Sequence, residues 1–259
     1  MKRVLLNQIP AEIPERFESL LRSAKVYDSS SSPEARVYFI DKDGGYFLKR
    51  AENRTLLREA QLTDYFHSKK LATAVVDYFS GDYDWLLTEK VQGEDCIHRM
   101  YLDEPVRLCD TTAELLRKLH EEDYSGCPMM NRTAEYLQTV EEVYRQQSAE
   151  RAPEHKGFRS VEEAYQEVQR NGKYLKADTL IHGDYCLPNI ILNQWKFSGF
   201  IDVGNGGVGD RHIDLYWALW SLKYNLKTDQ YRQRFLDSYG RDKVNEDVLR
   251  VIAAAEVFG

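Results

Sequence analysis

The sequence is poor in the features that mark several large classes of protein. Its 259 residues include only four cysteines, and no two of them form a CxxC pair. This argues against a disulfide framework and against the common zinc modules. No apolar run approaches the roughly 18 residues of a membrane-spanning helix, and the first residues lack the apolar stretch of a signal peptide. We therefore expect a protein of the reducing cytoplasm.

Basic residues are also in short supply. Thirty-five lysines and arginines face 42 acids, which gives a net charge of −7. A nucleic-acid-binding protein needs a basic face, so this balance argues against such a partner. It leaves room for a cationic or metal-bound ligand. We expect a monomer that acts on a small molecule, with no nucleic-acid or membrane partner.

The first third of the chain has the pattern of a sheet with one helix. Two apolar and aromatic runs flank a Gly-Gly turn at 35–40 and 46–50, and they predict a hairpin. Apolar residues at helical spacing follow within 55–71. Runs at 74–79 and 85–91 then predict two further strands.

Beyond Gly93 the patterns are mostly helical. Apolar stripes predict helices at 108–122, 131–147, 160–170, 213–222 and 248–258. The sequence therefore predicts an α+β fold of two lobes. A small β-rich lobe would span residues 1–91, and a larger, mostly helical lobe would span residues 92–259. The join between them is a favoured place for a ligand site.

Two acids and an amide follow short apolar strands in the second lobe. The stretch LIHGDYCLPNIIL places Asp184 and Asn189 five residues apart, and GFIDVG places Asp202 at the end of the next strand. An Asp can accept a proton from a substrate hydroxyl. Carboxylate and amide oxygens suit Mg²⁺, which usually takes one or two protein ligands besides phosphate oxygens. This order of residues is typical of kinases.

A kinase also needs a lysine for the α- and β-phosphates, held by a glutamate on the following helix. Lys49 lies on the second strand of the predicted hairpin, and Glu59 follows on the predicted helix. Both are present in the required order. The pairing would hold the Lys49 ammonium in place for the nucleotide.

The motifs HGDYCLPNI, FSGFIDVGNGGVGDRHID and AEVF together resemble the aminoglycoside 3'-phosphotransferases, which have a protein-kinase-like fold. The resemblance runs from residue 32 to residue 258. It implies ATP-dependent phosphorylation of an aminoglycoside hydroxyl, with antibiotic resistance as the result, and it leaves GTP open as a second donor. It also implies Mg²⁺, with Asp184 as catalytic base and Asn189 and Asp202 as metal ligands.

The resemblance assigns further residues to the two substrates. Those expected at the nucleotide are Lys49 with its partner Glu59, Ser32 over the phosphates, Phe47 on the adenine face, and the backbone of Glu89 and Val91 at the adenine edge. Those expected at the aminoglycoside are Glu154, Glu256 and the carboxyl end near Phe258.

Two departures concern the acceptor. The stretch ALWSLKYN has no acid where related enzymes often carry acids, and Gly259 follows the phenylalanine that usually ends the chain. One extra residue would move the terminal carboxylate by about 3.5 Å. A kinase of another amino alcohol or sugar therefore stays an alternative. A protein kinase is disfavoured, because the short path from Asp202 to Asp214 leaves little room for an activation loop. A nucleotide-binding module without catalysis is the remaining alternative.

Four other residues have a structural interpretation. His182 is expected to brace the loop of Asp184 by hydrogen bonding rather than to act as a base. Asp210 and Asp214 flank Arg211, and we expect the three to form a buried ion-pair network that anchors the chain.

Overall fold

The computed structural model describes residues 3–30, 35–147 and 156–259. Its contacts divide the chain into two compact units. The first unit comprises Met1–Asp95 and Ile191–Gly204, and the second comprises Cys96–Ile190 and Asn205–Gly259. A short stretch from late in the sequence therefore packs with the amino-terminal part. The roles expected for two lobes at 1–91 and 92–259 stay predictions.

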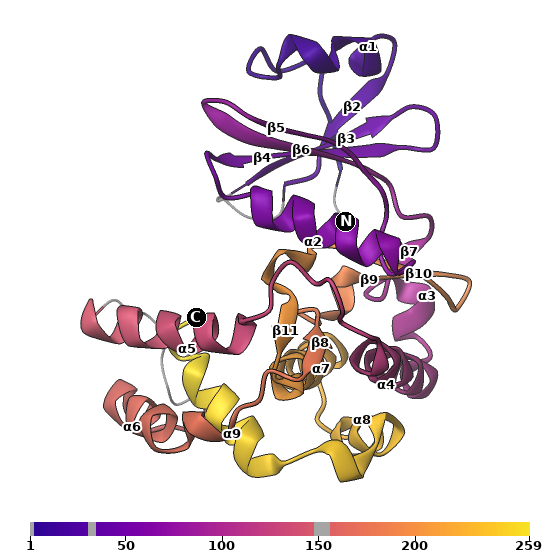
Figure 1. Ribbon diagram of the computed structural model, residues 1–259. Coiled ribbons are helices and arrows are strands. Elements are labelled where there is room, and N and C mark those ends of the chain that lie inside the picture. Colours follow the sequence, from indigo (N-terminus) through magenta and orange to yellow (C-terminus); the bar gives the residue numbers. More distant parts are fainter. Residues whose placement is uncertain (1–2, 31–34, 148–155) are drawn as a thin grey trace. The chain divides into compact units, whose positions relative to one another are not determined.

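The first unit is built on a six-stranded antiparallel sheet with the order β1-β2-β3-β4-β6-β5 (Figure 1). Its strands are β1 (Val4–Leu5), β2 (Lys25–Asp28), β3 (Arg36–Asp41), β4 (Tyr46–Glu52), β5 (Val75–Ser80) and β6 (Tyr83–Glu89). The predicted hairpin is confirmed as β3 and β4, and the two further predicted strands as β5 and β6. The two strands that precede the hairpin were not predicted.

Residues alternate between the two faces of this sheet, as the period of a strand requires. Leu48 and Leu87 face a core closed by the short helix α1 (Glu18–Leu21) and the turn before it. Leu86 points the other way and packs with Ala60 of helix α2 (Leu57–Ser68). The predicted helix within 55–71 is therefore confirmed. Figure 1 shows α1 and α2 on opposite faces of the sheet.

A small three-stranded sheet completes the first unit. It has the order β10-β9-β7, with β7 at Glu94–Asp95, β9 at Ile190–Asn193 and β10 at Lys196–Phe200. The Phe200 N–H donates to the Leu71 carbonyl at 2.7 Å, which ties β10 to the chain that follows α2. The residues after β10 are thereby fixed beside the larger sheet.

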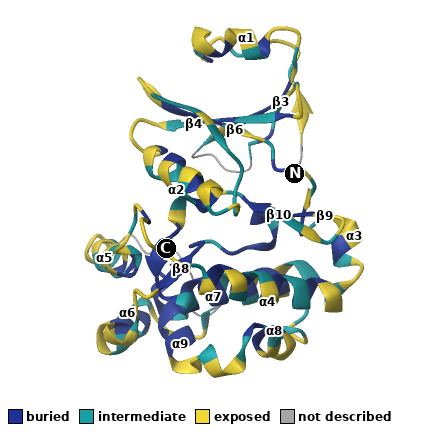
Figure 2. Ribbon diagram, turned by 45° about the vertical axis from the view of Figure 1, so that its right-hand side comes forward, coloured by how far each residue is buried: buried dark blue, intermediate teal, exposed yellow. Residues whose placement is uncertain are grey.

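The second unit is mostly helical. Its α-helices are α3 (Arg99–Leu102), α4 (Pro105–Glu121), α5 (Arg132–Arg145), α6 (Val161–Asn171), α7 (Arg211–Leu226), α8 (Arg232–Tyr239) and α9 (Glu246–Ala255). All five helices predicted beyond Gly93 are present, whereas α3 and α8 were not predicted. The core gathers apolar residues of α5, α6, α7 and α9, and Figure 2 shows that much of α9 is buried.

A two-stranded antiparallel sheet lies within this helical unit. Strand β8 (Thr179–Ile181) pairs with β11 (Gly207–Gly209), and every residue of both strands is buried. The chain leaves β8 directly into the loop that carries Asp184 and returns in β9. The predicted strand, loop and strand at 180–192 are confirmed.

All four cysteines are buried and lie outside any disulfide bond. Within the ranges that the structure describes, no helix is long and apolar enough to span a bilayer.

Candidate active site

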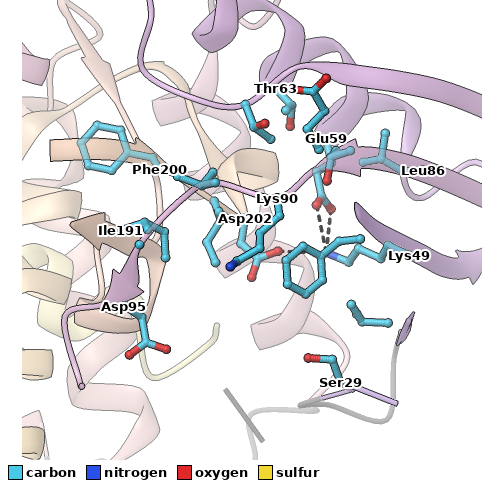
Figure 3. A pocket seen from close by; sticks show the side chains of 18 of the residues that line it. Ser29, Lys49, Glu59, Thr63, Leu86, Lys90, Asp95, Ile191, Phe200 and Asp202 are labelled. Carbon is cyan, nitrogen blue, oxygen red and sulfur yellow. Dashed lines mark hydrogen bonds and ion pairs between the residues drawn. The ribbon is translucent and has the colours of Figure 1, made fainter. Parts of the chain in front are cut away.

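A cavity of the first unit holds an ammonium group between two carboxylates (Figure 3). The Lys49 Nζ donates to both carboxylate oxygens of Glu59, at 3.0 and 2.8 Å, and to Oδ1 of Asp202 at 3.2 Å. All three residues line the cavity. The structure thus brings together three residues that the sequence separates widely.

Local structure explains how these side chains meet. Leu48 is fully buried on one face of β4, so Lys49 projects from the opposite face. Glu59 lies in the first turn of α2, which covers that same face. Near the end of β10, Gly204 approaches α2 so closely that an added Cβ would lie 3.2 Å from the Glu59 Cβ. A larger residue there would crowd the carboxylate that holds Lys49.

The electrostatics of the cluster keep the lysine charged. Burial alone would lower the pKa of the Lys49 ammonium, but the carboxylates of Asp202 and Glu59 outweigh burial and raise that pKa. Burial also raises the pKa of the Glu59 carboxyl, an effect that Lys49 opposes and Asp202 reinforces. Lys49 is therefore a permanent cation at neutral pH, as the binding of phosphate oxygens requires.

Asp202 combines exposure with a strained backbone. Its side chain is 54% exposed, and its φ of +56° lies in the left-handed region that costs a non-glycine residue about 1–2 kcal/mol. Strain of this kind persists where the surroundings impose it, and it concentrates at functional sites. The strained turn directs an accessible carboxylate into the cavity beside Lys49.

The same cavity contains the residues expected at the base of a nucleotide. Phe47, Glu89 and Val91 all line it, with Ile191 and Phe200 as further apolar walls. Phe47 lies on the face of β4 that also carries Lys49. The sequence did not single out Ile191 or Phe200, because both come from the strands that join this unit late in the chain. Two expected residues, Ser32 and Glu154, lie outside the described residues.

In the second unit, hydrogen bonds fix Asp184 and Asn189 to each other. The Asn189 Nδ2 donates to the Asp184 backbone oxygen at 3.0 Å and to its Oδ2 at 2.9 Å. The Leu187 N–H donates to the hydroxyl of Ser221 at 2.9 Å, which ties the loop to α7. The structure therefore pairs the expected base with one expected metal ligand.

The loop also depends on a buried carboxylate. Asp214 accepts hydrogen bonds from the backbone N–H groups of His182 and Gly183, each at 2.7 Å. His120 approaches it through Nε2 at 3.1 Å, and the other ring nitrogen of His120 lies 2.8 Å from the Tyr239 hydroxyl. Burial lowers the pKa of the His120 imidazole. The neutral ring therefore donates from Nε2 to Asp214 and accepts from Tyr239.

The prediction that Arg211 forms ion pairs with Asp210 and Asp214 is wrong. The carboxylate of Asp210 lies 2.7 Å from the ring of His212, and that of Asp214 contacts His120. Arg211 instead donates to the hydroxyl of Thr179 at 3.1 Å. The sequence offers no local signal for a histidine of α4 beside an aspartate of α7, since the two are remote in the chain.

The ring of His182 contacts the backbone of the loop, as the expected bracing role requires. The ring is fully buried, and its Nδ1 accepts the Asp184 N–H at 3.3 Å. A ring that holds the backbone of Asp184 in this way positions that residue.

Two of the three residues expected at the acceptor, Glu256 and Phe258, are buried. Tyr136 donates to Oε1 of Glu256 at 2.7 Å, and the Lys156 Nζ donates to the Glu256 backbone oxygen at 2.6 Å. Phe258 packs edge-on against Tyr144 and Tyr165. These contacts anchor the end of the chain, while the roles of Glu256 and Phe258 toward an acceptor stay predictions.

Asp202 in the first unit and Asn189 in the second each present an oxygen of a kind that suits a magnesium ion bound mainly by nucleotide phosphates. Nowhere in the described ranges do three or more His, Cys, Asp and Glu side chains form a metal cage. Mg²⁺ needs no such cage, because one or two protein oxygens and phosphate oxygens suffice. The carboxylate of Asp202 is accessible. Asn189 uses its amide nitrogen on Asp184, which leaves its carbonyl oxygen as the end suited to a cation.

Comparisons with known proteins show the family of this chain. The model of the phosphotransferase enzyme family matches residues 28–252. A probable aminoglycoside 3'-phosphotransferase of Lactococcus lactis is 49% identical over 250 residues, which cover 96% of this chain and 95% of that protein.

Solved structures show the same fold. A type VIII aminoglycoside 3'-phosphotransferase matches with a TM-score of 0.76 at 25% identity, covering 95% of this chain and all of its own. An aminoglycoside phosphotransferase of Streptomyces rimosus matches with a TM-score of 0.69 at 20% identity, covering 94% of this chain and 97% of its own. Fold and site define a kinase of the protein-kinase-like class, one that transfers phosphoryl groups to hydroxyls. The chain belongs to the phosphotransferase enzyme family.

The first prediction concerns Gly183. A Cβ there would lie 1.9 Å from the Asn205 backbone oxygen, and its φ is +83°. Gly126 has a similar φ of +77° but nothing within 4 Å of an added Cβ, so it is the matched control. Gly126→Ala should cost only the backbone strain of about 1–2 kcal/mol. Gly183→Ala should cost clearly more in urea denaturation, and equal losses would contradict the close approach.

The second prediction concerns the buried His120. Because its folded pKa lies below the ordinary 6.5, the unfolded chain takes up a proton that the native protein resists as the pH falls through 6.5. Stability contributed by the neutral ring is complete above 6.5 and is lost below it, at up to about 1.4 kcal/mol per pH unit. Urea denaturation from about pH 7.5 to 5.5 should therefore show a shallower loss in His120→Gln than in the wild type. A slope in His120→Gln equal to that of the wild type would contradict this role of the buried ring.

Proposed function

We propose that the protein transfers the γ-phosphoryl group of ATP to a hydroxyl of an aminoglycoside, the 3'-hydroxyl, and so confers resistance to the antibiotic. The observation that carries this proposal is the Lys49 ammonium, held by Glu59 beside the accessible carboxylate of Asp202 in one cavity. The names of the relatives support the acceptor. The Lactococcus relative is called a probable aminoglycoside 3'-phosphotransferase, and the Streptomyces structure contains ADP and streptomycin.

In this proposal the first unit binds the nucleotide. Phe47 would stack on the adenine, and the backbone of Glu89 and Val91 would meet its edge. Lys49 would neutralise oxygens of the α- and β-phosphates. Glu59 would not touch the nucleotide but would keep the ammonium in place, as its two hydrogen bonds to Lys49 suggest.

The transferred group carries its charge on the phosphoryl oxygens, so catalysis is mainly positioning and neutralisation. Bound Mg²⁺ would supply positive charge to those oxygens, and Asn189 and Asp202 would hold it. Asp184 would accept a hydrogen bond from the acceptor hydroxyl and take its proton late in the transfer. The Asn189 amide would keep the Asp184 carboxylate oriented toward the hydroxyl.

The carboxyl end would contribute to the acceptor. Glu256 carries a carboxylate that would attract a substrate ammonium, and Phe258 would pack beside it. Tyr136 already donates to Glu256 and is itself buried, so this carboxylate has a fixed direction. We also assign Ser32 to the phosphates and Glu154 to the acceptor, on the resemblance of the sequence alone.

A kinase of another amino alcohol or sugar is the second candidate, and the surface of α7 favours it. Trp220 and Tyr224 are 43% and 57% exposed and stack with ring centroids 5.0 Å apart. Lys223 on the same helix is cationic and pairs with Asp229 at 2.8 Å. Aromatic and cationic side chains at this surface are less suited to a polycationic antibiotic than carboxylates are.

The third prediction tests the base. Asp184→Ala should lower kcat by at least about 100-fold while leaving the affinity for ATP near that of the wild type, because Asp184 acts on the acceptor. Asp178→Ala removes an exposed acid just before β8 and should leave both quantities unchanged. Turnover near that of the wild type in Asp184→Ala would show that another group is the base.

The fourth prediction tests the acceptor. In a coupled ADP-release assay with MgCl₂, aminoglycosides that carry a 3'-hydroxyl should be turned over, whereas analogues that lack this hydroxyl should not. A parallel panel of simple amino alcohols and sugars separates the second candidate. Turnover of that panel alone would overturn the aminoglycoside assignment but would still support kinase activity. ATP binding without ADP release for every acceptor would favour a binding module.

A further inference from the structure

An arginine near the amino-terminus lines the cavity that holds Lys49. Arg3 precedes the edge strand β1, far from Lys49 in the sequence, yet both residues line the same cavity. Its guanidinium carbon lies 3.7 Å from the ring centroid of Phe39 and 5.8 Å from that of Phe47. The guanidinium therefore covers Phe39 and stands beside the aromatic ring that we assign to the adenine.

The fold holds this arginine in place through the edge of the sheet. Strand β1 pairs with β2 in the register Val4↔Asp28 and Leu5↔Tyr27. The next residue, Leu6, donates its N–H to the Val26 carbonyl at 2.9 Å and packs against the core beneath. The position of Arg3 is thus set by the pairing of β1, which begins at the next residue.

Strand register shows which part of a nucleotide Arg3 would meet. Phe39 pairs with Phe47, whereas Val37 pairs with Lys49, two residues away on each of the antiparallel strands. Two residues of a strand span about 7 Å. The arginine therefore lies level with Phe47, at the expected base, and one row away from the lysine expected at the phosphates.

We propose that Arg3 is a nucleotide-binding residue that contacts the nucleoside half of ATP. A base stacked on Phe47 would lie about 3.5–4 Å above that ring, which is the height of the guanidinium above Phe39. The guanidinium would then lie beside the base or the ribose. Guanidinium nitrogens donate only, so their partners would be ribose hydroxyls or ring nitrogens of the base. This inference rests on the proposed nucleotide site.

The experiment compares two ligands that share the nucleoside and differ in phosphate. The affinities of adenosine and of ATP with MgCl₂ are measured by calorimetry for the wild type and Arg3→Ala. Both ligands should lose affinity by the same factor, roughly three- to ten-fold for one exposed guanidinium contact. Arg3→Lys keeps the charge but loses the planar donor edge, and it should recover less than half of that loss in free energy.

Arg16→Ala is the matched control. Its guanidinium also lies over an aromatic ring of this unit, 4.7 Å from the centroid of Phe79, but it pairs with Asp77 and does not line the cavity. This variant should bind both ligands as the wild type does. Circular dichroism of all variants checks that the sheet is retained.

Three outcomes would overturn the inference. Unchanged affinities in Arg3→Ala would mean that the arginine only supports the edge strand. Tighter binding would mean that it competes with the nucleotide, and a loss confined to ATP would place it at the phosphates. The proposed function has its own separate failure, because wild-type protein that binds neither adenosine nor ATP would overturn that proposal directly.

Discussion

One buried carboxylate, that of Asp214, fixes the loop that carries Asp184, the base in the proposed function. It is fully buried and accepts the backbone N–H groups of His182 and Gly183. A buried charge that loses its partners costs several kcal/mol, so the loop cannot move without a large penalty. His120 supplies a third donor as a neutral ring, which fixes one side of the carboxylate without adding a second charge. The position of Asp184 is therefore set by residues of α4 and α7 as much as by its own loop.

The first unit uses the same kind of constraint with the sign reversed. There the partly buried ion is the ammonium of Lys49, and the carboxylates of Glu59 and Asp202 hold it. Bidentate bonding to Glu59 fixes the direction of the lysine side chain, which a single surface ion pair would not do. Asp202 accepts strain in its backbone to complete the cluster. In both units, charge and hydrogen bonding fix the positions of the polar side chains, while the apolar core holds the strands and helices that carry them.

Sequence patterns predicted what depends on local structure. Alternation and helical spacing identified β3 to β6 and most helices, and the order of Lys49 and Glu59 suggested the pair that the structure brings together. Contacts between segments that are remote in the sequence could not be predicted in this way. Neither the pairing of His120 with Asp214 nor the stacking of Arg3 on Phe39 produces a periodic pattern in the sequence. Close packing is equally absent from the sequence pattern. The sequence alone does not indicate that the Asn205 backbone oxygen leaves no room for a Cβ at Gly183.

Helix α7 separates the parts that hold the loop from the parts that face solvent. Asp214 and Ser221 are seven residues apart, hence on one side of the helix, and both bind the loop of Asp184. Trp220 and Tyr224 project from a different side and are exposed. The face of Tyr224 is already covered by the Lys227 ammonium at 4.1 Å, so it offers a cationic substrate little of the weak attraction that an aromatic ring can provide. Substitution at these exposed positions leaves Asp214 and Ser221 untouched. The contacts that fix the loop of Asp184 are therefore independent of the side chains on the exposed face of α7.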